Sequence, residues 1–146
     1  MRVSSRGHYG LRMMVEMAAH KGNGLIKMST IAQSFHTPPK YLHNLLGLLK
    51  NAGLVRAQAG KGGGYALTRA PEDIKVSEIL HVLEGLPTPV GCVYDGQVCP
   101  RSEYCAARTI WTRMAEAVEQ VLKSATLADL VALEQGRRDP TIPCDV

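Results

Sequence analysis

The chain has 146 residues, of which 45% are hydrophobic and 21% charged, and its net charge is +4. These proportions match a globular domain and exclude collagen-like, low-complexity and wholly disordered chains. No apolar run approaches the roughly 18 residues of a membrane span, and Arg2, Arg6 and Arg12 interrupt the apolar stretch that a signal peptide requires, so we expect a cytoplasmic protein.

Charge is divided unevenly along the chain. Residues 1–75 carry 11 Lys or Arg and 3 Asp or Glu, whereas residues 76–146 carry 6 Lys or Arg and 10 Asp or Glu. A positive field concentrated in one segment attracts a polyanion such as nucleic acid. The first half is therefore expected to face nucleic acid, although a merely basic surface has the same composition.

Apolar residues recur at intervals of three and four near the amino terminus. This spacing predicts a helix from residue 4 or 5 to about residue 21, and a short second helix that begins after Ser29, its N-cap. A third helix is expected to begin with Thr37 as its N-cap and Pro38 at the first helical position. Two short helices joined by a tight turn are typical of a helix-turn-helix, although a plain helical hairpin gives the same pattern.

The start of the third helix carries side chains suited to reading DNA. In a helix-turn-helix the second helix enters the major groove, and its first residues reach base edges. Here those residues are Pro39, Lys40, Tyr41, His43 and Asn44. The Asn44 amide matches N6 and N7 of adenine, and Lys40 and His43 can donate to guanine or phosphate. We expect Tyr41, His43 and Asn44 to discriminate between bases.

A β-hairpin with a glycine-rich tip follows the third helix. Alternating residues predict strands over 54–58 and 65–68, and the segment Gly60-Lys61-Gly62-Gly63-Gly64 must turn between them. Glycine allows the backbone to approach a groove or a phosphate closely, and Lys61 adds a cation, as in a DNA-binding wing. The motif and the element order of a nucleotide-binding P-loop are absent.

These segments resemble the winged-helix transcription regulators of the family that includes IscR, NsrR, RirA and CymR. The resemblance is carried by the opening segment 4–12 (SSRGHYGLR), by Tyr41-Leu42 and by the wing segment 60–67 (GKGGGYAL), and it extends from residue 1 to about residue 133. It implies a mainly α fold with a small β wing, and a homodimeric DNA-binding regulator, a repressor, on a near-palindromic operator.

Contacts to DNA are expected from the amino terminus, from the two helices of the helix-turn-helix and from the wing. Arg2, Ser4, Arg56 and Lys61 are expected mainly at phosphates or in the minor groove. The full set of candidate DNA contacts is Arg2, Ser4, Ser29, Thr30, Thr37, Pro39, Lys40, Tyr41, His43, Asn44, Arg56, Gly60, Lys61 and Gly62.

Three of the four cysteines are clustered in the second half. Cys92, Cys99 and Cys105 are separated by six and five residues, which argues for metal or redox chemistry in a cytoplasmic protein. Zinc sites prefer shorter spacings, so an iron-sulfur cluster fits better, with zinc and metal-free thiols left open. The resemblance to IscR-, NsrR- and RirA-like members implies that these three cysteines hold a cluster, 2Fe-2S or 4Fe-4S.

The fourth ligand of such a cluster differs from one branch of the family. IscR-like members have a histidine three residues after the third cysteine, where this chain has Arg108, which cannot ligate. NsrR-like members use a carboxylate from the other subunit, and the matching position here is His8, a possible ligand, although it equally suits a surface or phosphate-contacting residue. Other candidates are a non-protein ligand, Asp95, Glu103 and Cys144.

Four segments are expected along the chain. They are a winged helix-turn-helix domain (1–84), a cysteine-bearing cluster loop (85–105), a dimerisation helix with a short packing helix (106–135) and a mobile tail (136–146). The first of these is expected to end in a helix that follows Pro71, has Ser77 near its start and stops at Gly85. A helix over about 106–123 has a longer apolar stripe than one small domain can cover, and the family resemblance implies a dimer built on it. Packing of this helix on its own domain is the alternative.

Two other functions are compatible with parts of this pattern. A thiol- or zinc-based regulator without a cluster retains the same fold, as in CymR-like relatives, which act through a protein partner. An iron-sulfur electron carrier needs the cysteines but does not account for the basic half and the wing. No nucleophile, base and orienting group can be assembled from the spacing, so we do not expect an enzyme.

Overall fold

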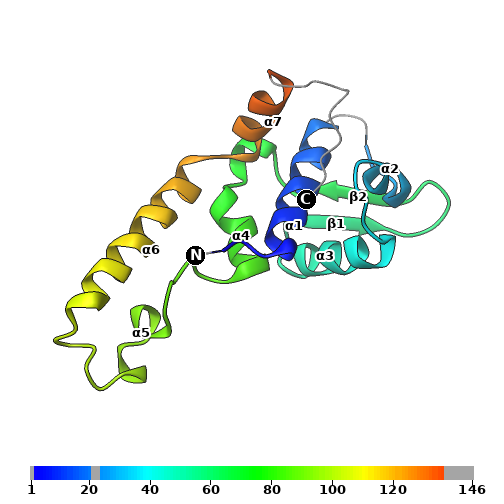
Figure 1. Cartoon of the computed structure of the whole chain (residues 1–146). Helices are drawn as coiled ribbons and strands as arrows, with labels where there is room; N and C mark the ends of the chain where they lie inside the picture. The colour runs from blue at the N-terminus through cyan, green and yellow to red at the C-terminus, as the bar shows by residue number, and fades with distance from the viewer. Residues whose placement is uncertain (1, 21–23, 137–146) are drawn as a thin grey trace.

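A computed structural model describes residues 2–20 and 24–136 of the chain. Its first part is a helix-turn-helix followed by a β-hairpin, the wing (Figure 1). The two strands are antiparallel and pair Val55 with Leu67 and Gln58 with Gly64. The elements of this part are α1 (Ser5–Ala19), α2 (Met28–Gln33), α3 (Pro39–Asn51), β1 (Val55–Gln58) and β2 (Gly64–Leu67).

The second part contains the cysteines and the longest helix. Its elements are η1 (Pro71–Asp73), α4 (Val76–Glu84), α5 (Gly91–Tyr94), η2 (Gly96–Val98), α6 (Ala106–Ser124) and α7 (Leu127–Gln135). In Figure 1, α6 extends away from the winged domain with α5 beside its far end, and α7 returns to lie near α1. The mainly helical fold with a small β wing is as predicted.

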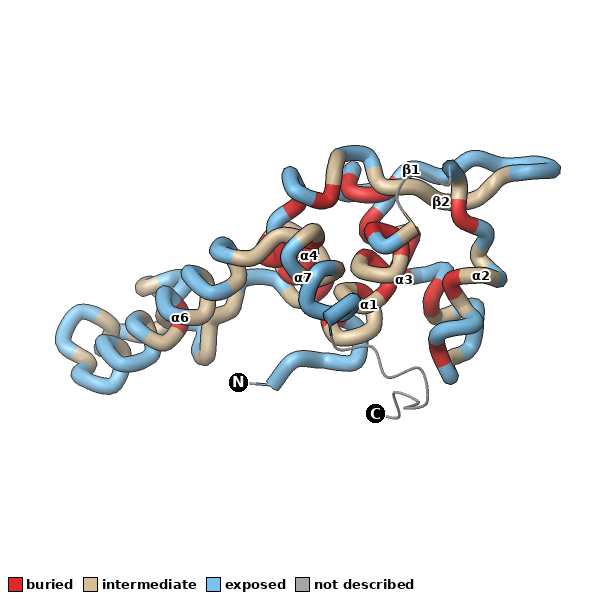
Figure 2. Tube along the Cα trace, turned by 90° about the horizontal axis from the view of Figure 1, so that it is seen from above, coloured by how far each residue is buried: buried red, intermediate tan, exposed pale blue. Residues whose placement is uncertain are grey.

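The core lies between α1, α3 and α4. Met13 and Met14 of α1 are fully buried against the apolar faces of α3 and α4. In Figure 2 the buried residues gather in these helices, whereas α6 and the loop beyond it are mostly exposed or intermediate. The core residues of α3 and α4 are Leu42, Leu45, Leu46, Leu49, Ile79 and Leu83. This apolar packing stabilises the winged domain, and Leu127 of α7 adds to it from the end of the chain.

The starts of the second and third helices differ slightly from the prediction. The second helix begins two residues earlier than predicted, and the third begins one residue later. The second helix begins at Met28 with Lys27 as N-cap, so Ser29 is not the cap. Ile26 pairs with Tyr65 in a β-bridge, which keeps the chain extended until just before Met28. The third helix begins at Pro39 rather than Pro38, and Thr37 does not cap it. Proline disfavours helical backbone in the residue before it, so Pro39 holds its predecessor extended.

The other predicted elements are confirmed to within a few residues. The first helix is capped by Ser4, and the wing strands and the helices over 76–84 and 106–124 are present. The last helix packs against α1, with Thr126 as its N-cap. Residues 21–23, where the first helix was expected to end, lie outside the described residues, as do Cys144 and, except for Gly136, the segment 136–146 predicted as a tail.

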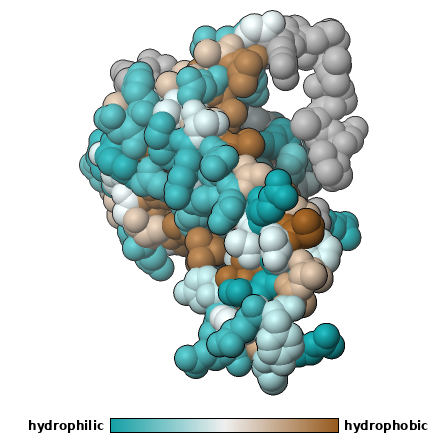
Figure 3. Space-filling model, turned by 90° about the vertical axis from the view of Figure 1, so that its left-hand side faces the viewer, coloured by the Kyte–Doolittle hydropathy of each residue, from teal (hydrophilic) through white to brown (hydrophobic). Residues whose placement is uncertain are grey.

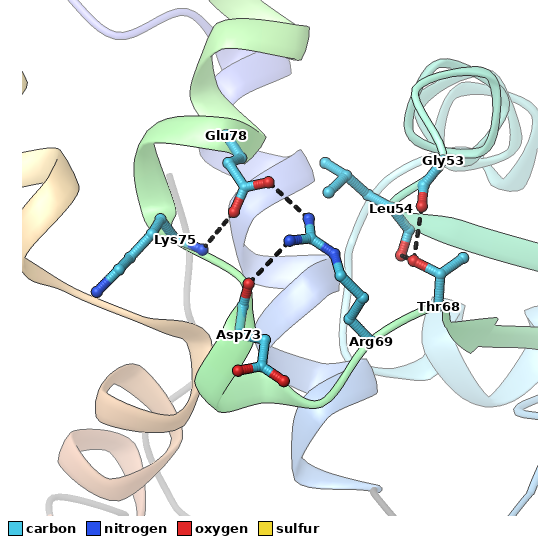
Figure 4. Close-up of polar contacts among 7 residues, drawn as sticks. All are labelled: Gly53, Leu54, Thr68, Arg69, Asp73, Lys75 and Glu78. Carbon is cyan, nitrogen blue, oxygen red and sulfur yellow. Dashed lines mark hydrogen bonds and ion pairs between the residues drawn. The ribbon is translucent and has the colours of Figure 1, made fainter.

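Two residues fasten the end of the wing to the rest of the domain (Figure 4). The Thr68 hydroxyl donates to the carbonyl of Gly53 at 2.6 Å, just after α3. The Arg69 guanidinium donates to the Glu78 carboxylate at 2.6 Å and to the Asp73 carbonyl at 2.9 Å. Partial burial acts to raise the pKa of Glu78, but the hydrogen bonds from Arg69 and from the Lys75 backbone outweigh it and lower the pKa. The wing is therefore tied to both α3 and α4.

Candidate functional site

Helix α3, the second helix of the helix-turn-helix, exposes the polar side chains near its start. Four leucines spaced at helical intervals bury the opposite face of α3 in the core. This orientation leaves Lys40, His43 and Asn44 exposed, together with Pro39 at the first turn. The same face carries no acidic residue in its first turn. The geometry therefore presents hydrogen-bonding groups and positive charge where a helix-turn-helix reads DNA.

Tyr41 and His43 are held in different ways. Tyr41 is half-buried and packs edge-on against Tyr9, with ring centroids 6.2 Å apart and planes at 87°. His43 is exposed, and its Nδ1 lies 2.9 Å from the hydroxyl of Tyr65 in the wing. The Tyr41 ring is thus packed against α1, whereas the His43 ring links α3 to the wing.

The tip of the wing is a glycine turn around a lysine. Gly60 and Gly62 have φ values of 95° and 86°, which other residues rarely adopt, and Gly63 donates to the carbonyl of Gly60 at 2.9 Å. Lys61 is exposed at this turn, and Arg56 is exposed on β1. The turn therefore presents backbone and positive charge together, as a phosphate or groove contact requires.

A groove of about 690 Å³ separates α3 from the wing. Among the residues that line it are Lys27, His43, Asn44, Lys50 and Tyr65. Other predicted DNA contacts lie outside this groove. Arg2 is exposed ahead of α1, and Ser29 is exposed and Thr30 half-buried on α2.

Ser4, which was predicted as a DNA contact, caps the first helix. Its side-chain oxygen accepts hydrogen bonds from the backbone N–H groups of Arg6 and Gly7, which caps α1. The hydroxyl also donates to the Glu84 carboxylate at the end of α4. Thr37, which was predicted as both a helix cap and a DNA contact, is half-buried between α2 and α3.

The three clustered cysteines lie on one loop at the far end of α6. Cys92 belongs to α5, Cys99 follows η2 and Cys105 is the N-cap of α6, and each is partly buried. α5 contacts both η2 and α6, so the loop folds back on itself. All three residues are free thiols.

Arg108 crosses the inside of this cysteine loop. Its Nε donates to the carbonyl of Cys92 at 2.8 Å, and Nη1 lies 3.4 Å from the carbonyl of Ser102. The Ser102 hydroxyl in turn donates to the carbonyl of Gly96 at 2.5 Å. The Arg108 guanidinium on α6 thus joins two segments of the loop, at Cys92 and at Ser102.

The donor set of the loop suits an iron-sulfur cluster, because thiolates are the usual ligands of such clusters. Within residues 2–20 and 24–136, however, no three His, Cys, Asp or Glu side chains gather into a group that could hold a metal ion. His8 has a buried Nε2 that finds no hydrogen-bond partner among the described residues. The side chains of Asp95 and Glu103 are exposed, and Asp95 accepts from the backbone N–H of Gln97.

The α6 helix presents apolar side chains to solvent. Ile110 is 52% exposed and Val121 is 68% exposed, and Trp111 is also exposed. Viewed from the side that α6 occupies in Figure 1, apolar patches lie between hydrophilic residues (Figure 3). α6 contacts α4 of the winged domain, where the Glu119 carboxylate lies 2.8 Å from Nε2 of His81. Most of the predicted apolar stripe is therefore uncovered within one chain.

Comparison with known proteins identifies the family. The sequence model of the family described as Rrf2, iron-dependent transcriptional regulator, matches residues 3–133. The chain belongs to the Rrf2 family. It is a transcriptional regulator with a winged helix-turn-helix, as the resemblance implied. Within the described residues, no helix is long and apolar enough to cross a membrane.

Relatives in the Rrf2 family cover almost the whole chain. Protein Rrf2 of Nitratidesulfovibrio vulgaris is 37% identical over 90% of this chain and 87% of its own length. The structure of CymR, the global cysteine regulator of B. subtilis, is 38% identical with a TM-score of 0.76, and the match covers 91% of this chain and 98% of that one. The structure of T. potens IscR is 32% identical with a TM-score of 0.74, over 99% and 94% of the two chains.

The contacts of three residues were not predicted from the sequence. Tyr65 and Arg108 make hydrogen bonds to residues 22 and 16 positions away, and Glu84 bonds to residues about 80 positions away. For Glu84, the available signal was its position at the end of a predicted helix. For Tyr65 and Arg108, sequence spacing gives no indication of the partner, because the contacts depend on the tertiary fold.

Proposed function

We propose that this Rrf2-family regulator binds DNA as a homodimer through α3 and the wing, and that thiol ligands on its cysteine loop control its DNA affinity. The observation that carries the DNA-binding part is the groove between α3 and the wing, where exposed His43 and Asn44 of α3 face residues of the hairpin that include Ala59 and Gly63. Lys40 is exposed at the start of α3, and Lys61 is exposed at the wing tip. Base-reading groups and a phosphate-binding cation stand on adjacent elements there, as in a winged helix.

The two kinds of contact have different roles. Asn44 can make two hydrogen bonds to one adenine, so its loss is expected to reduce discrimination between sequences. Lys61 at the wing tip neutralises a phosphate, so its loss is expected to weaken binding to all sequences alike. Arg2 and Arg56 belong with Lys61 in this second class.

The test begins with selection of a preferred operator from random duplex DNA. Binding to this operator and to a scrambled duplex is then measured by fluorescence anisotropy over a range of salt concentrations. Asn44→Ala is expected to lose about 5- to 150-fold in affinity for the operator and little for the scrambled duplex. Lys61→Ala is expected to weaken both and to reduce the salt slope by about one.

Lys75→Ala is the matched control for Lys61→Ala. Lys75 is exposed at the start of α4, and its backbone bridges to Thr126 beside α7, away from the wing. The control removes the same charge and is expected to leave the salt slope unchanged. Equal weakening of both duplexes by Asn44→Ala would contradict the assignment of α3 as the base-reading helix in this register.

The homodimer is proposed from the uncovered apolar face of α6. Ile110 and Val121 expose surface that one chain does not cover, and burying such surface favours association. A two-fold dimer pairs two recognition helices with two half-sites, so the selected operator is expected to be near-palindromic. Ile110→Asp combined with Val121→Asp is expected to yield monomers by analytical ultracentrifugation, and a retained dimer would place the interface elsewhere.

For the control of DNA affinity we propose an iron-sulfur cluster held by Cys92, Cys99 and Cys105, with His8 of the partner subunit as the fourth ligand. The donor chemistry of the three thiols and the unpaired Nε2 at position 8 support this set. A bound cluster supplies iron whose ligation responds to iron supply, nitric oxide or redox status. Arg108, bonded to the carbonyl of Cys92, links the loop to α6.

The iron and sulfide content of the protein distinguishes a regulator with an iron-sulfur cluster from one that uses metal-free thiols or zinc. Protein purified without oxygen is analysed by native mass spectrometry and visible absorption, with Cys99→Ala and His8→Ala beside the wild type. We expect iron and sulfide in the wild type, their loss in Cys99→Ala and weaker retention in His8→Ala. A metal-free or zinc-only dimer that also resists reconstitution with iron and sulfide would contradict the cluster and favour a thiol- or zinc-based regulator of the same fold.

A further inference from the structure

Tyr65 of the wing hydrogen-bonds to the ring of His43 on the recognition helix. The tyrosine oxygen lies 2.9 Å from Nδ1 of His43, and the rings stand edge to face, with centroids 6.2 Å apart and planes at 79°. His43 is exposed, and both residues line the groove between α3 and the wing. Within the described residues, Nε2 of His43 makes no hydrogen bond, so it is the ring nitrogen left for a ligand.

Tyr65 is itself held firmly on both sides of its strand. It pairs with Ala57 across the hairpin. On its other side, its N–H donates to the carbonyl of Ile26, and its carbonyl accepts from the N–H of Ile26, both at 2.8 Å. Gly64 permits this close approach, because a Cβ there would lie 2.5 Å from the Ile26 carbonyl oxygen. The backbone that carries the phenol is therefore paired on both edges, with β1 on one side and with the isolated bridge at Ile26 on the other.

The chemistry of the pair selects one tautomer of the histidine. A neutral imidazole has one N–H and one acceptor nitrogen, and the hydrogen bond at one nitrogen decides the role of the other. A phenol O–H is a better donor than an imidazole N–H, and an imidazole nitrogen is a better acceptor than a phenol oxygen. The favoured bond therefore runs from the Tyr65 hydroxyl to Nδ1 of His43, and the ring proton stays on Nε2.

We propose that Tyr65 is a positioning residue that fixes His43 in the Nε2–H tautomer, so that the recognition helix presents a hydrogen-bond donor to the DNA. This inference rests on the proposed DNA-binding function and adds a base preference to it. A donor matches the O6 and N7 acceptors of guanine and the O4 acceptor of thymine. Adenine sets its N7 acceptor beside an N6 amino donor, and cytosine presents only its N4 amino donor. At the base that faces His43 we therefore expect guanine or thymine, with cytosine disfavoured.

The tautomer is measured on the free protein, without DNA. Long-range proton–nitrogen correlation spectra of the histidine rings distinguish the Nε2–H, Nδ1–H and exchanging forms, at about pH 8.5, where histidine is ordinarily neutral. His43→Gln assigns the signal. We expect the Nε2–H pattern in the wild type and a shift toward exchange averaging in Tyr65→Phe, which keeps the ring and removes only the hydroxyl.

Tyr94→Phe is the matched control, because Tyr94 is 72% exposed on α5, far along the chain from the wing. It removes the same hydroxyl and is expected to leave the His43 signal unchanged. An Nδ1–H pattern or an averaged pattern in the wild type would overturn the inference, as would an unchanged pattern in Tyr65→Phe. Because no DNA is present, this arm decides the tautomer whether or not the proposed function holds.

Base preference is measured in a second arm with the selected operator. The base pair that faces His43 is identified as the pair at which His43→Ala no longer discriminates between bases. Affinity for the parent duplex is then compared with affinity for a duplex in which that pair is inverted. Tyr65→Phe is expected to reduce this discrimination about fivefold, with an unchanged salt slope, and to add little when combined with His43→Ala. If Tyr65→Phe instead weakens binding to all duplexes equally, while its thermal unfolding is normal, the specificity role is overturned. Such a result would show that the hydroxyl supports the wing as a whole and not the reading of one base.

The two arms separate the possible failures. A fixed tautomer in a protein that binds no duplex would contradict the proposed function and leave the Tyr65–His43 assignment standing. Sequence-specific binding with discrimination unaffected by Tyr65→Phe would contradict the specificity role and leave the proposed function standing.

Discussion

The carboxylate of Glu84, the last residue of α4, accepts a hydrogen bond from the backbone N–H of Gly7 in the first turn of α1, at 2.8 Å. The Ser4 hydroxyl donates to the same carboxylate. A negative charge at a helix amino terminus satisfies free N–H groups and interacts favourably with the helix dipole. These bonds therefore join the end of α4 to the start of α1, just before the connector to the cysteines begins at Gly85.

Removal of this capping carboxylate is expected to destabilise the fold. Glu84→Ala leaves the Gly7 N–H with only its longer bond to Ser4, at 3.4 Å, and removes the partner of the Ser4 hydroxyl, so we expect the free energy of unfolding to fall by about 1–2 kcal/mol. Urea denaturation followed by circular dichroism measures the change. Glu134→Ala, at an exposed position on α7, is the control and should have little effect. Equal stability of the two variants would mean that Glu84 does not support α1.

Two helical glycines are expected to respond oppositely to alanine. A Cβ on Gly10 of α1 would lie 2.2 Å from Cδ1 of buried Leu83, so Gly10→Ala is expected to cost about 1–3 kcal/mol by overpacking. A Cβ on Gly47 of α3 meets nothing within 4 Å, so Gly47→Ala is expected to stabilise by about 0.5–1 kcal/mol. Thermal unfolding of both variants measures the difference. A stabilised Gly10→Ala would show that α1 and α4 pack less closely than described.

The sequence was sufficient to predict the parts of the fold that depend on local pattern. The helices over 5–19, 76–84 and 106–124 follow from apolar spacing, and the wing follows from two short alternating segments around a glycine turn. The exposed side chains at the start of α3 follow as well, because its leucines define the buried face. These features need only residues that are close together in the chain.

Features that depend on tertiary contacts could not be predicted. The short helix α5 and the turn η2 lie within what spacing describes as a loop, and they are held by contacts with each other and with α6. Tyr41 looks like a base-reading side chain in the sequence, but its ring packs against Tyr9, more than 30 positions away. Whether Tyr41 reaches a base therefore stays a prediction.

The ion pair between α4 and α6 predicts a pH dependence of stability. The hydrogen bond from Lys123, followed by that from His81, lowers the pKa of Glu119 below its ordinary value. A carboxyl group with a lowered folded-state pKa contributes stability above its unfolded pKa and loses it as pH falls through the folded pKa. The stability difference between wild type and Glu119→Gln is therefore expected to be present above the ordinary glutamate pKa of about 4.3 and to be lost as pH falls below it.

Urea denaturation at a series of pH values checks this dependence. Glu116→Gln, at an exposed position on the same helix, is the control and should differ from wild type by a small amount that does not change with pH. A difference for Glu119→Gln that grows as pH falls would contradict the assigned direction of the pKa shift.

Arg108 is expected to keep the cysteine loop closed when no metal is bound. Its guanidinium bonds to the carbonyls of Cys92 and Ser102, and loss of a hydrogen bond costs about 1 kcal/mol, so Arg108→Ala should populate the open loop about fivefold more. Alkylation of reduced, chelator-treated protein, followed by peptide mapping, should reveal faster modification of Cys92. Arg113→Ala removes a charge from an exposed position on the same helix and should alkylate like wild type. If both variants react at the wild-type rate, the loop is held by its α5, η2 and α6 packing rather than by Arg108, and the guanidinium is not what joins the cysteines to the long helix.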